Sequence, residues 1–515
     1  MTYNVLLEDL INDLGGCGLY QWILASIVHV GKTMATWSMI TMTFAGQSPG
    51  FLCGSGQYET NESLANIYND SIVDVCSSNG SSCTNYVFED DMTTIVTEFD
   101  LVCDKKWIPA TITTIQMAGV LLGCLVSGHL ADMIGRKPTY FIAILVTVVF
   151  NIAGYFSPSW QVYSALRFLI GIGIGFYLTV QYSFTNEFAS AKWRPPIVTT
   201  PSWATEASLF ALVAWGLHDW KKIHLAIACV GTPFLFTWWI MPESFRWLVT
   251  KQRFKKAQTV VNFIAKVNKA DQPSLDKIFA EAKINTDKDD TRKHYSFLDL
   301  FRTRESTKIT IGLLFAWFAA SYGYYGITFG VKSLSGDLYM NMFLINVVET
   351  PVMVLTAFLV NWFGRKKVCF TFYILAGVSG ISVGVIQHFA LPVNGTLTNV
   401  IALLSKLSVA SGWQAMIVYT TEIYPTVVRT IAYGVHSTAA RVGGMVAPQI
   451  VFLDDDIPGI LYFLSGVLMM ISAVVMMLYR ETKDAVLEDM LNVEVKIEDN
   501  LEKNKDVQLS SSTNL

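Results

Sequence analysis

Long apolar segments constrain this chain more than any other feature. We place twelve of them, each about twenty residues long, which is the length that a helix needs to cross a bilayer. Of the 515 residues, 52% are hydrophobic and only 15% are charged, and the mean hydropathy is +0.41, so a soluble protein is excluded. The predicted spans lie at about 18–44, 108–131, 139–157, 161–185, 197–217, 221–241, 308–331, 338–362, 368–389, 397–420, 431–453 and 457–479.

A short polar turn, GHLADMIGRK at 128–137, separates the second and third spans. Its Gly-Arg-Lys at 135–137 recurs at 364–366, an offset of 229, again between apolar runs. We expect Gly128 to let two helices approach closely and Asp132 to face the positive end of a neighbouring helix. The recurrence indicates more than an ordinary solvated turn.

Three further acidic and basic landmarks repeat in the same order. A glutamate and an arginine that lie seven positions apart recur together 235 residues later, and another glutamate recurs 238 residues later. The pairs are Glu187 and Arg194 with Glu422 and Arg429, and Glu243 with Glu481. Repeated landmarks at nearly one spacing predict two related halves, and therefore an all-α membrane protein with two pseudo-repeated six-helix bundles.

The charges of the loops predict the orientation. Basic residues fall in loops of one parity, which we assign to the cytoplasm together with both termini, although Lys221 and Lys222 are an exception. Glycosylation sequons fall on the opposite side, at Asn61, Asn69, Asn79 and Asn394. We therefore expect a multi-pass glycoprotein of the plasma membrane whose first span replaces a cleavable signal peptide.

Four cysteines share the long loop between the first two spans: Cys53, Cys76, Cys83 and Cys103. On the external side they predict two disulfides, for which three connectivities are possible. No CxxC pair or histidine accompanies them, so we expect no metal site.

The polar segments outside the spans complete the predicted organisation. We expect a cytoplasmic N-terminus at 1–17, an N-terminal bundle at 18–241 with an external loop at 45–107, and a C-terminal bundle at 308–479. The linker at 242–307 contains the amphipathic stretch RFKKAQTVVNFIAKV and should form short helices near the membrane surface. The tail at 480–515 is polar and is expected to be disordered.

Several motifs together resemble the major facilitator superfamily, and within it the organic cation, organic anion and carnitine transporter family, solute carrier family 22. They are TTIVTEFDLVCDKKW, GVLLGCLVSGHLADMIGRK, RFLIGIGIGF, PESFRWL and YTTEIYPTVVR, which extend over nearly the whole chain. Met133 and Asn361 depart from the superfamily pattern, where Arg and Asp are usual. The run at 167–176 predicts close helix approach at Gly171, Gly173 and Gly175 and a structural role for Arg167.

The resemblance implies a cavity between two bundles that opens alternately to each side. Polar residues at the cytoplasmic ends would then clamp the bundles together while the cavity faces outward. These predicted gating residues are Asp132, Arg136, Glu187, Arg194, Glu422 and Arg429.

Five charged residues within spans are candidates for recognising the solute, because a charge in a lipid-embedded helix usually faces a cavity or a partner. They are Lys32, Glu206, Glu349, Lys406 and Arg441. Arg441 resembles an arginine of the anion and carnitine branches and can bind a carboxylate in a bidentate manner; a salt bridge with Glu206 or Glu349 is the alternative. Lys406 resembles a lysine of those branches, and its alternative is a buried structural pair.

Aromatic residues of the seventh and tenth spans complete the predicted site. Trp317 and Tyr324 share a helical face with Tyr325 beside them, and Trp413 and Gln414 follow Lys406 at a spacing that puts them on its face. Packing between helices is an equally good interpretation of such a stripe.

We expect a secondary transporter that moves small organic anions or carnitine-like zwitterions as a uniporter, an exchanger or an ion-coupled carrier. An organic cation transporter is the alternative, and a nontransporting receptor is a further one. No GxxxxGK[ST], HExxH or GxSxG motif occurs, so we expect neither an ATP-driven pump nor an enzyme, and no cofactor. The expected partners are a small organic solute, the lipid bilayer and a coupling ion or counter-substrate; the net charge of -4 excludes nucleic acid, and we expect a monomer.

Overall fold

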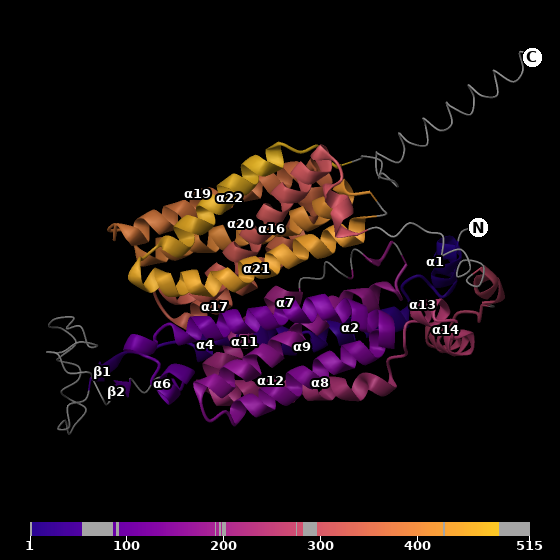
Figure 1. The fold of residues 1–515 in the computed structure, drawn as a ribbon, viewed down its shortest axis with the longest axis horizontal. Coiled ribbons are helices and arrows are strands. Elements are labelled where there is room, and N and C mark those ends of the chain that lie inside the picture. Colours follow the sequence, from indigo (N-terminus) through magenta and orange to yellow (C-terminus); the bar gives the residue numbers. More distant parts are fainter. Residues whose placement is uncertain are drawn as a thin grey trace, which may run out of the picture. The chain divides into compact units, whose positions relative to one another are not determined.

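The computed structural model describes residues 3–53, 86–88, 92–190, 192–194, 197, 202–273, 275–281, 296–425 and 428–483, which are almost entirely helical (Figure 1). Twelve helical spans follow one another along the chain. They are α2 to α4 (Leu19–Gly31, Thr33–Ile40, Met42–Ala45), α7 (Ile108–Ile134), α8 (Arg136–Tyr155), α9 (Trp160–Asn186), α11 (Ser202–Leu217), α12 (Trp220–Leu235), α16 (Arg304–Phe329), α17 with α18 (Leu338–Val347, Glu349–Phe363), α19 (Arg365–His388), α20 (Gly395–Ile423), α21 (Arg429–Asp456) and α22 (Ile460–Met477).

These helices confirm the twelve predicted spans, and most bounds agree within a few residues. Among the described residues, eight of the spans are long and apolar enough to cross a membrane by length and composition alone. Of the other four, α11 and α12 have only 16 residues each, whereas α16 and α21 are long enough but more polar. The last turn predicted for the sixth span forms the 3-10 helix η2 (Phe236–Trp239) instead, directly after α12, which contains Pro233 near its end.

The chain divides into two compact units. Unit 1 comprises residues 1–290, 328–347 and 445–456. Within it, α7 and α9 pack at backbone distance: a Cβ atom added at Gly171 or Gly175 would meet the backbone of α7, and one at Gly173 would meet Thr147 of α8. The expected close approach at these three glycines is therefore confirmed. The same expectation for Gly128 is wrong, because a Cβ there would meet no atom within 4 Å.

The segment before α7 covers one end of these helices in unit 1. Helix α6 (Ile95–Phe99) and the 3-10 helix η1 (Cys103–Lys105) join α4, α7, α9 and α12 in an apolar cluster that includes Ile95, Leu101 and Trp220. Glu98 also accepts a hydrogen bond from Lys221 at 2.7 Å. Two short antiparallel strands, β1 (Phe51–Cys53) and β2 (Tyr86–Phe88), lie beside them. Asn61, Asn69, Asn79, Cys76 and Cys83 lie outside the described residues, as does the Cys53 side chain.

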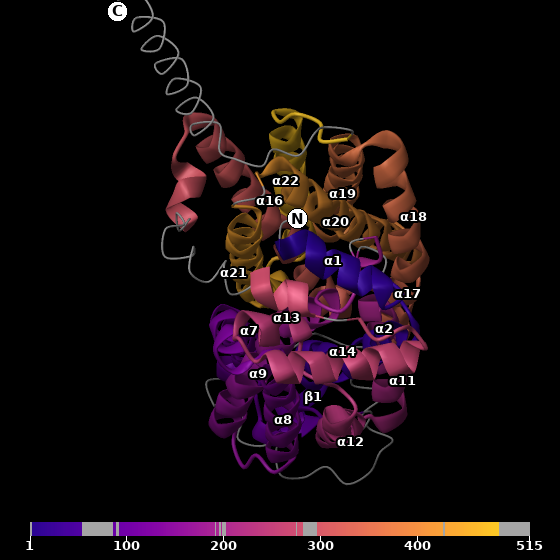
Figure 2. The same ribbon diagram turned by 90° about the vertical axis from the view of Figure 1, so that its right-hand side faces the viewer.

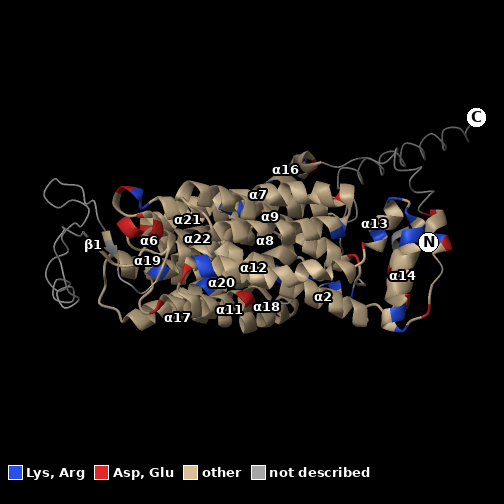
Figure 3. Ribbon diagram, turned by 90° about the horizontal axis from the view of Figure 1, so that it is seen from below, with Lys and Arg blue, Asp and Glu red and all other residues tan. Residues whose placement is uncertain are grey.

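The polar linker folds into short helices, as its amphipathic pattern predicts. They are α13 (Phe245–Thr250), α14 (Phe254–Asn268) and, in the second unit, the 3-10 helix η3 (Phe297–Phe301). Helix α14 buries one apolar face, including Val261 and Ile264, and lies beside the N-terminal helix α1 (Tyr3–Asp13), as Figure 2 shows. Lys, Arg, Asp and Glu are frequent on these helices and sparse along the middle of the spans (Figure 3). The tail beyond residue 483 lies outside the described residues.

Unit 2 comprises residues 291–327, 348–444 and 457–515, and therefore most of α16, α21 and all of α18, α19, α20 and α22. In Figure 1 these helices run from orange to yellow, with α19 packed against both α20 and α22. Tyr373 of α19 and Tyr419 of α20 are fully buried in this core. Helix α21 belongs to both units, because its last turns, from Met445, are part of unit 1.

Candidate functional site

A buried ion pair lies in unit 2 at the point where the eighth span is interrupted. Glu349 is the first residue of α18, and its carboxylate lies 3.4 Å from the ammonium group of Lys406 on α20. The Tyr324 hydroxyl of α16 donates to the same carboxylate, at 3.0 Å and 3.3 Å from its two oxygens. Both charged side chains are almost completely buried. This geometry is the paired alternative that the sequence left open for Lys406.

Four aromatic rings gather next to this pair. The Trp413 ring lies 5.8 Å from Tyr324, 6.4 Å from Tyr325 and 6.4 Å from Trp317, measured between ring centroids. The two tyrosine rings are nearly perpendicular, and the Lys406 ammonium lies 5.2 Å from the centroid of Tyr324. We call Trp317, Tyr324, Tyr325 and Trp413 the aromatic cluster. The structure thus brings together aromatic residues that sequence spacing assigned to one face of the seventh span and one face of the tenth.

Polar atoms in and beside the aromatic cluster remain unsatisfied. The indole nitrogen of Trp413, the Gln414 side-chain oxygen and the Ser321 hydroxyl are buried and have no hydrogen-bond partner among the described residues. Trp413 and Gln414 are only partly buried as whole side chains. A buried polar group without a partner costs free energy, so these atoms are well suited to meet a polar ligand.

Arg441 lies on the part of α21 that runs beside α16. Tyr433 and His436, earlier on α21, contact the Trp317 ring at 5.5 Å and 6.2 Å between centroids. One turn after Arg441, a Cβ added at Gly444 would lie 3.2 Å from the Tyr325 ring. Arg441 therefore lies along α21 between positions that both contact the aromatic cluster, and its side chain is partly exposed.

Unit 1 contains a second buried pair, at the interruption between α2 and α3. The Lys32 ammonium lies 3.9 Å from Glu206 of α11 and contacts the Ser202 hydroxyl. Thr36 donates to the other oxygen of Glu206 at 2.6 Å, and the Trp37 indole donates to the Glu206 backbone carbonyl at 2.8 Å. Each of the two intramembrane glutamates therefore lies within ion-pair distance of a lysine of its own unit.

Arg167 of α9 is fully buried and links three helices. It donates to the Ser38 carbonyl at 2.9 Å and to the Gln116 side chain, which itself donates to that carbonyl at 3.0 Å. Helix α3 ends at Ile40, so this carbonyl lies in its last turn, where intrahelical donors run out. The contacts support the structural role expected for Arg167.

The two repeated turns have the same backbone geometry. Gly135 and Gly364 both have positive φ, of 116° and 100°, and begin α8 and α19. In the first turn Glu243 accepts from the backbone N–H groups of Arg136 and Lys137, at 3.0 Å and 3.1 Å. In the second, Glu481 accepts from the corresponding N–H groups of residues 365 and 366, at 2.9 Å and 3.2 Å. A carboxylate at a helix N-terminus satisfies donors that have no partner within the helix.

The two carboxylates differ in ionisation. Burial raises the pKa of Glu243 above its ordinary value. Burial also acts to raise the pKa of Glu481, but four backbone N–H groups more than offset it and hold that pKa below its ordinary value. Asp132 accepts from the side chain of Arg136, the first residue of α8, at 2.6 Å, whereas the carboxylate that caps the backbone N–H groups of α8 belongs to Glu243. That Asp132 faces the positive end of a neighbouring helix stays a prediction.

The other predicted gating residues pair within their own units. Arg136 donates to Glu187 at 2.9 Å in unit 1, and Arg365 donates to Glu422 at 2.8 Å to 3.0 Å in unit 2. Arg429 donates to the Tyr424 carbonyl at 3.4 Å. The repeat in the sequence is therefore also a repeat of ion pairs.

Arg194 has a partner that the sequence pattern did not predict. Glu8 of α1 accepts from Arg194 and, at 2.7 Å, from Arg246 of α13. Although burial acts to raise it, the hydrogen bonds from these two arginines lower the pKa of Glu8. The Asn268 side chain of α14 also donates to the Leu14 carbonyl at 2.7 Å. Arg246 lies in the PESFRW motif, which was a signal for its importance, whereas nothing in the sequence singled out Glu8.

Among the described residues, no group of three or more His, Cys, Asp or Glu side chains could hold a metal ion. Asn394 is exposed, and its side chain caps α20 by accepting from the Thr396 backbone N–H at 2.9 Å. Among the described residues the free cysteines are Cys17, Cys124, Cys229 and Cys369, and Cys103, the one loop cysteine whose side chain is described, is not among them.

Comparisons with known proteins agree with this architecture. A family model described as sugar (and other) transporter matches residues 24–493. Solute carrier family 22 member 4 of Mus musculus is 30% identical over 411 residues, 79% of this chain and 73% of its own length. The organic cation transporter protein of Drosophila melanogaster is 27% identical over 508 residues, 92% of either chain. A partially occluded inward-open structure of the xylose transporter XylE from E. coli shares the fold, with a TM-score of 0.66 at 16% identity over 91% of this chain and 100% of that one.

Proposed function

We propose that this chain moves small organic anions or carnitine-like zwitterions across the plasma membrane. It belongs to the sugar and other transporter family of the major facilitator superfamily, and within it to solute carrier family 22. It is a multi-pass membrane transporter of small solutes and not an enzyme. The choice of solute is our proposal. The observation that carries it is the aromatic cluster of unit 2, which lies beside the Glu349 and Lys406 pair and along the helix that bears Arg441.

The charges near the aromatic cluster favour a carboxylate. Glu349 lies within ion-pair distance of Lys406, so these two charges offset each other. Arg441 then adds a positive charge on the neighbouring helix, and a guanidinium binds a carboxylate through two parallel hydrogen bonds. We propose Arg441 as the carboxylate-binding residue and Gln414 and the Trp413 indole as further hydrogen-bonding groups. Lys406 acts through its pair with Glu349, which fixes the aromatic cluster.

The aromatic cluster extends the proposal to zwitterions. Electron-rich ring faces attract quaternary ammonium groups, and Tyr324, Tyr325, Trp317 and Trp413 offer several faces within one volume. A betaine-like solute would place its ammonium group there and its carboxylate near Arg441. A simple organic anion would place its apolar body in the same position.

Transport by alternating access follows from two bundles with matching gates. We propose that Asp132, Arg136, Glu187, Arg194, Glu422 and Arg429 exchange partners when the bundles close on the cytoplasmic side. The pair of Lys32 and Glu206 would lie in the N-terminal bundle, where a coupling ion or a counter-substrate could act on it. We keep the proposed division into bundles at 18–241 and 308–479, joined by the linker at 242–307, and a monomeric state.

We also propose the orientation that the loop charges predict, with both termini in the cytoplasm. The sequons at Asn61, Asn69, Asn79 and Asn394 would then be accessible to glycosylation, and Cys53, Cys76, Cys83 and Cys103 would form two disulfides. What supports the disulfides is that four cysteines share one predicted external loop and that Cys103, the one of them whose side chain the structure describes, is not a free thiol. Glycosidase treatment and thiol labelling before and after reduction would test both assignments.

Uptake of labelled solutes by cells expressing the wild type and Arg441→Ala tests the choice of solute. We expect the wild type to take up both a monocarboxylate and a betaine. Arg441→Ala should take up each solute at least tenfold more slowly at equal surface abundance, because a charge-assisted bidentate contact contributes about 1.5 to 3 kcal/mol. Lys308→Ala, which removes an exposed charge at the start of α16, is the matched control. Equal uptake by Arg441→Ala and the wild type for every solute would refute the assignment.

Organic cation transport is the second candidate, favoured by the names of two relatives, the organic cation transporter protein and the organic cation/carnitine transporter 2 of Mus musculus. It predicts that Arg441→Asp preserves or increases uptake of a quaternary amine. Our proposal predicts instead that Trp413→Leu reduces betaine uptake more than monocarboxylate uptake, because only the betaine has an ammonium group to place against the rings.

A further inference from the structure

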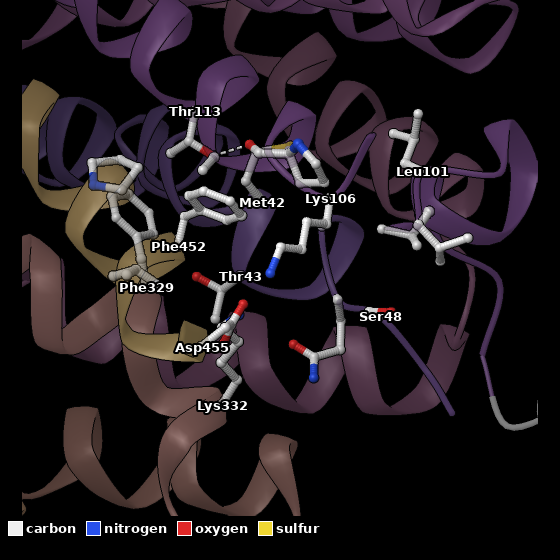
Figure 4. A pocket seen from close by; sticks show the side chains of 18 of the residues that line it. Met42, Thr43, Ser48, Leu101, Lys106, Thr113, Phe329, Lys332, Phe452 and Asp455 are labelled. Carbon is white, nitrogen blue, oxygen red and sulfur yellow. Dashed lines mark hydrogen bonds and ion pairs between the residues drawn. The ribbon is translucent and has the colours of Figure 1, made fainter. Parts of the chain in front are cut away.

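A cavity of about 260 Å³ lies in unit 1, whereas the residues proposed for solute recognition by the aromatic cluster belong to unit 2 (Figure 4). It is lined by residues of α4, η1, the start of α7, the 3-10 helix η4 (Gly330–Ser333) and the last turns of α21. Apolar side chains such as Met42, Leu101, Phe329 and Phe452 form much of its wall. Their arrangement would accommodate the hydrocarbon part of a small molecule.

The polar part of the lining contains two lysines. Lys106 and Lys332 both line the cavity, and Figure 4 shows the ammonium end of Lys106 directed toward the side chains of Thr43 and Asp455. Lys106 also lies 5.6 Å from the centroid of the Phe452 ring. Asp455 is the one acidic residue among the described residues that line the cavity. The lining is therefore amphipathic, with an excess of one positive charge.

Both lysines are held by aspartates at the end of α21. Lys106 lies 2.5 Å from Asp456, and Lys332 lies 2.8 Å from each oxygen of Asp455. The four side chains are between 29% and 50% exposed. Exposed pairs of this kind contribute little net free energy, so either lysine can exchange its aspartate for a dissolved carboxylate at small cost.

We propose that this cavity is an outer docking site for small amphipathic carboxylates, in which Lys106 and Lys332 exchange their aspartates for the carboxylate of the ligand. The hydrocarbon part of the ligand lies against Phe329 and Phe452. The exchange releases the last turn of α21 from Lys106 and Lys332, so that arrival of the ligand loosens the contacts that hold this end of the helix. That this site faces the outside of the cell, and that it is connected with transport, rests on the proposed function and topology.

Protection of an introduced cysteine tests the site without requiring transport. Ser48 is exposed and lines the cavity, so Ser48→Cys can be labelled with a membrane-impermeant maleimide on intact cells kept on ice. The variant is combined with Arg441→Ala, which removes the proposed central carboxylate site. The probes are octanoate and octyltrimethylammonium, which have similar chains and opposite charges, and the chain with Ser48 intact gives the background.

At octanoate concentrations about four times the dissociation constant, we expect labelling to slow about fivefold, because only the unoccupied fraction reacts. Octyltrimethylammonium should not slow it. The double variant Lys106→Met/Lys332→Met should lose the protection, and Lys105→Met, whose exposed side chain does not line the cavity, should keep it. Lys106→Gln/Lys332→Gln provides a second charge-free variant should the methionine pair fail to reach the surface.

Three results would overturn the proposal: no protection by octanoate, equal protection by both probes, and protection that persists without the two lysines. None of them bears on the central site, because Arg441 is already replaced. Conversely, a wild type that takes up only cations would refute the proposed function while leaving octanoate protection of Ser48→Cys intact.

Discussion

Replacing Lys406 by methionine should destabilise the protein far more than replacing both members of its ion pair. The Lys406 ammonium and the Glu349 carboxylate lie 3.4 Å apart, with exposed side-chain fractions of 0% and 2%. Removing one charge leaves the other buried without its partner, which costs about 3 to 5 kcal/mol. The Tyr324 hydroxyl still donates to Glu349, and a hydrogen bond to a charged group recovers about 1.5 to 3 kcal/mol at most.

The double variant Lys406→Met/Glu349→Gln removes both charges and keeps the shapes. It should be close to the wild type in stability, because replacement of a whole buried pair is often neutral. A double-mutant cycle therefore predicts a coupling free energy of about 3 kcal/mol between the two residues.

Titration with sodium dodecyl sulfate in mixed micelles measures the free energy of unfolding of each variant, and uptake is measured in parallel. Lys221→Met, which removes a lysine from a more exposed pair with Glu98, is the control and should cost less than about 1 kcal/mol. A Lys406→Met protein as stable as the wild type, but without uptake, would refute this reasoning. Lys406 would then serve the solute directly.

Three further predictions concern the docking of α1, the carboxylates at the starts of α8 and α19, and the packing of α9 against α7. Glu8→Gln should weaken docking of α1 by about 2 kcal/mol, because Glu8 accepts hydrogen bonds from two arginines, and this is measured as faster hydrogen exchange in residues 3–13. Asp9→Asn, at an exposed neighbouring position, should leave hydrogen exchange unchanged. Faster exchange in both variants would contradict the role of Glu8. The pKa of Glu481 is lowered in the folded protein, so its contribution to stability is present at neutral pH and is lost as the pH falls through that lowered pKa. The pKa of Glu243 is raised, so its contribution to stability is greatest in acid and declines as the pH rises. Stabilities of Glu481→Ala and Glu243→Ala relative to the wild type should therefore change with pH in opposite directions, and parallel pH profiles would show that the two caps are electrostatically alike. Gly175→Val should cost about 3 kcal/mol and reduce the yield of monodisperse protein, because its Cβ would meet the α7 backbone, whereas Gly128→Ala should be tolerated; equal yields would contradict the packing argument.

The fold was predictable because bilayer thickness acts on every span in the same way. Apolar runs of about twenty residues report helix length directly, and this is why the predicted and observed ends of α7, α8 and α9 differ by only a few residues. The repeated turn was equally informative, since Gly135 and Gly364 adopt the same positive φ. Gly128 misled the prediction because a glycine in a sequence does not indicate which side of the helix another helix covers.

The candidate site was only partly predictable. Helical spacing placed Trp317 and Tyr324 on one face, and rarity of charge within spans identified Lys406 and Glu349. Which of the two lysines each glutamate approaches depends on helix rotation and tilt, which periodicity does not determine. The contact of Glu8 with Arg246 joins positions 238 apart in the chain through exposed polar segments, where no periodic pattern exists to reveal it.

Helix α21 carries Arg441 near its middle, and Pro448 follows about two turns further along the helix. Proline removes a backbone hydrogen bond and crowds the preceding turn, so a helix bends more readily there than elsewhere. Arg441 therefore precedes this proline along the helix, and Asp455 and Asp456 follow it. A bend at the proline would let the residues before it and the residues after it change direction independently of one another.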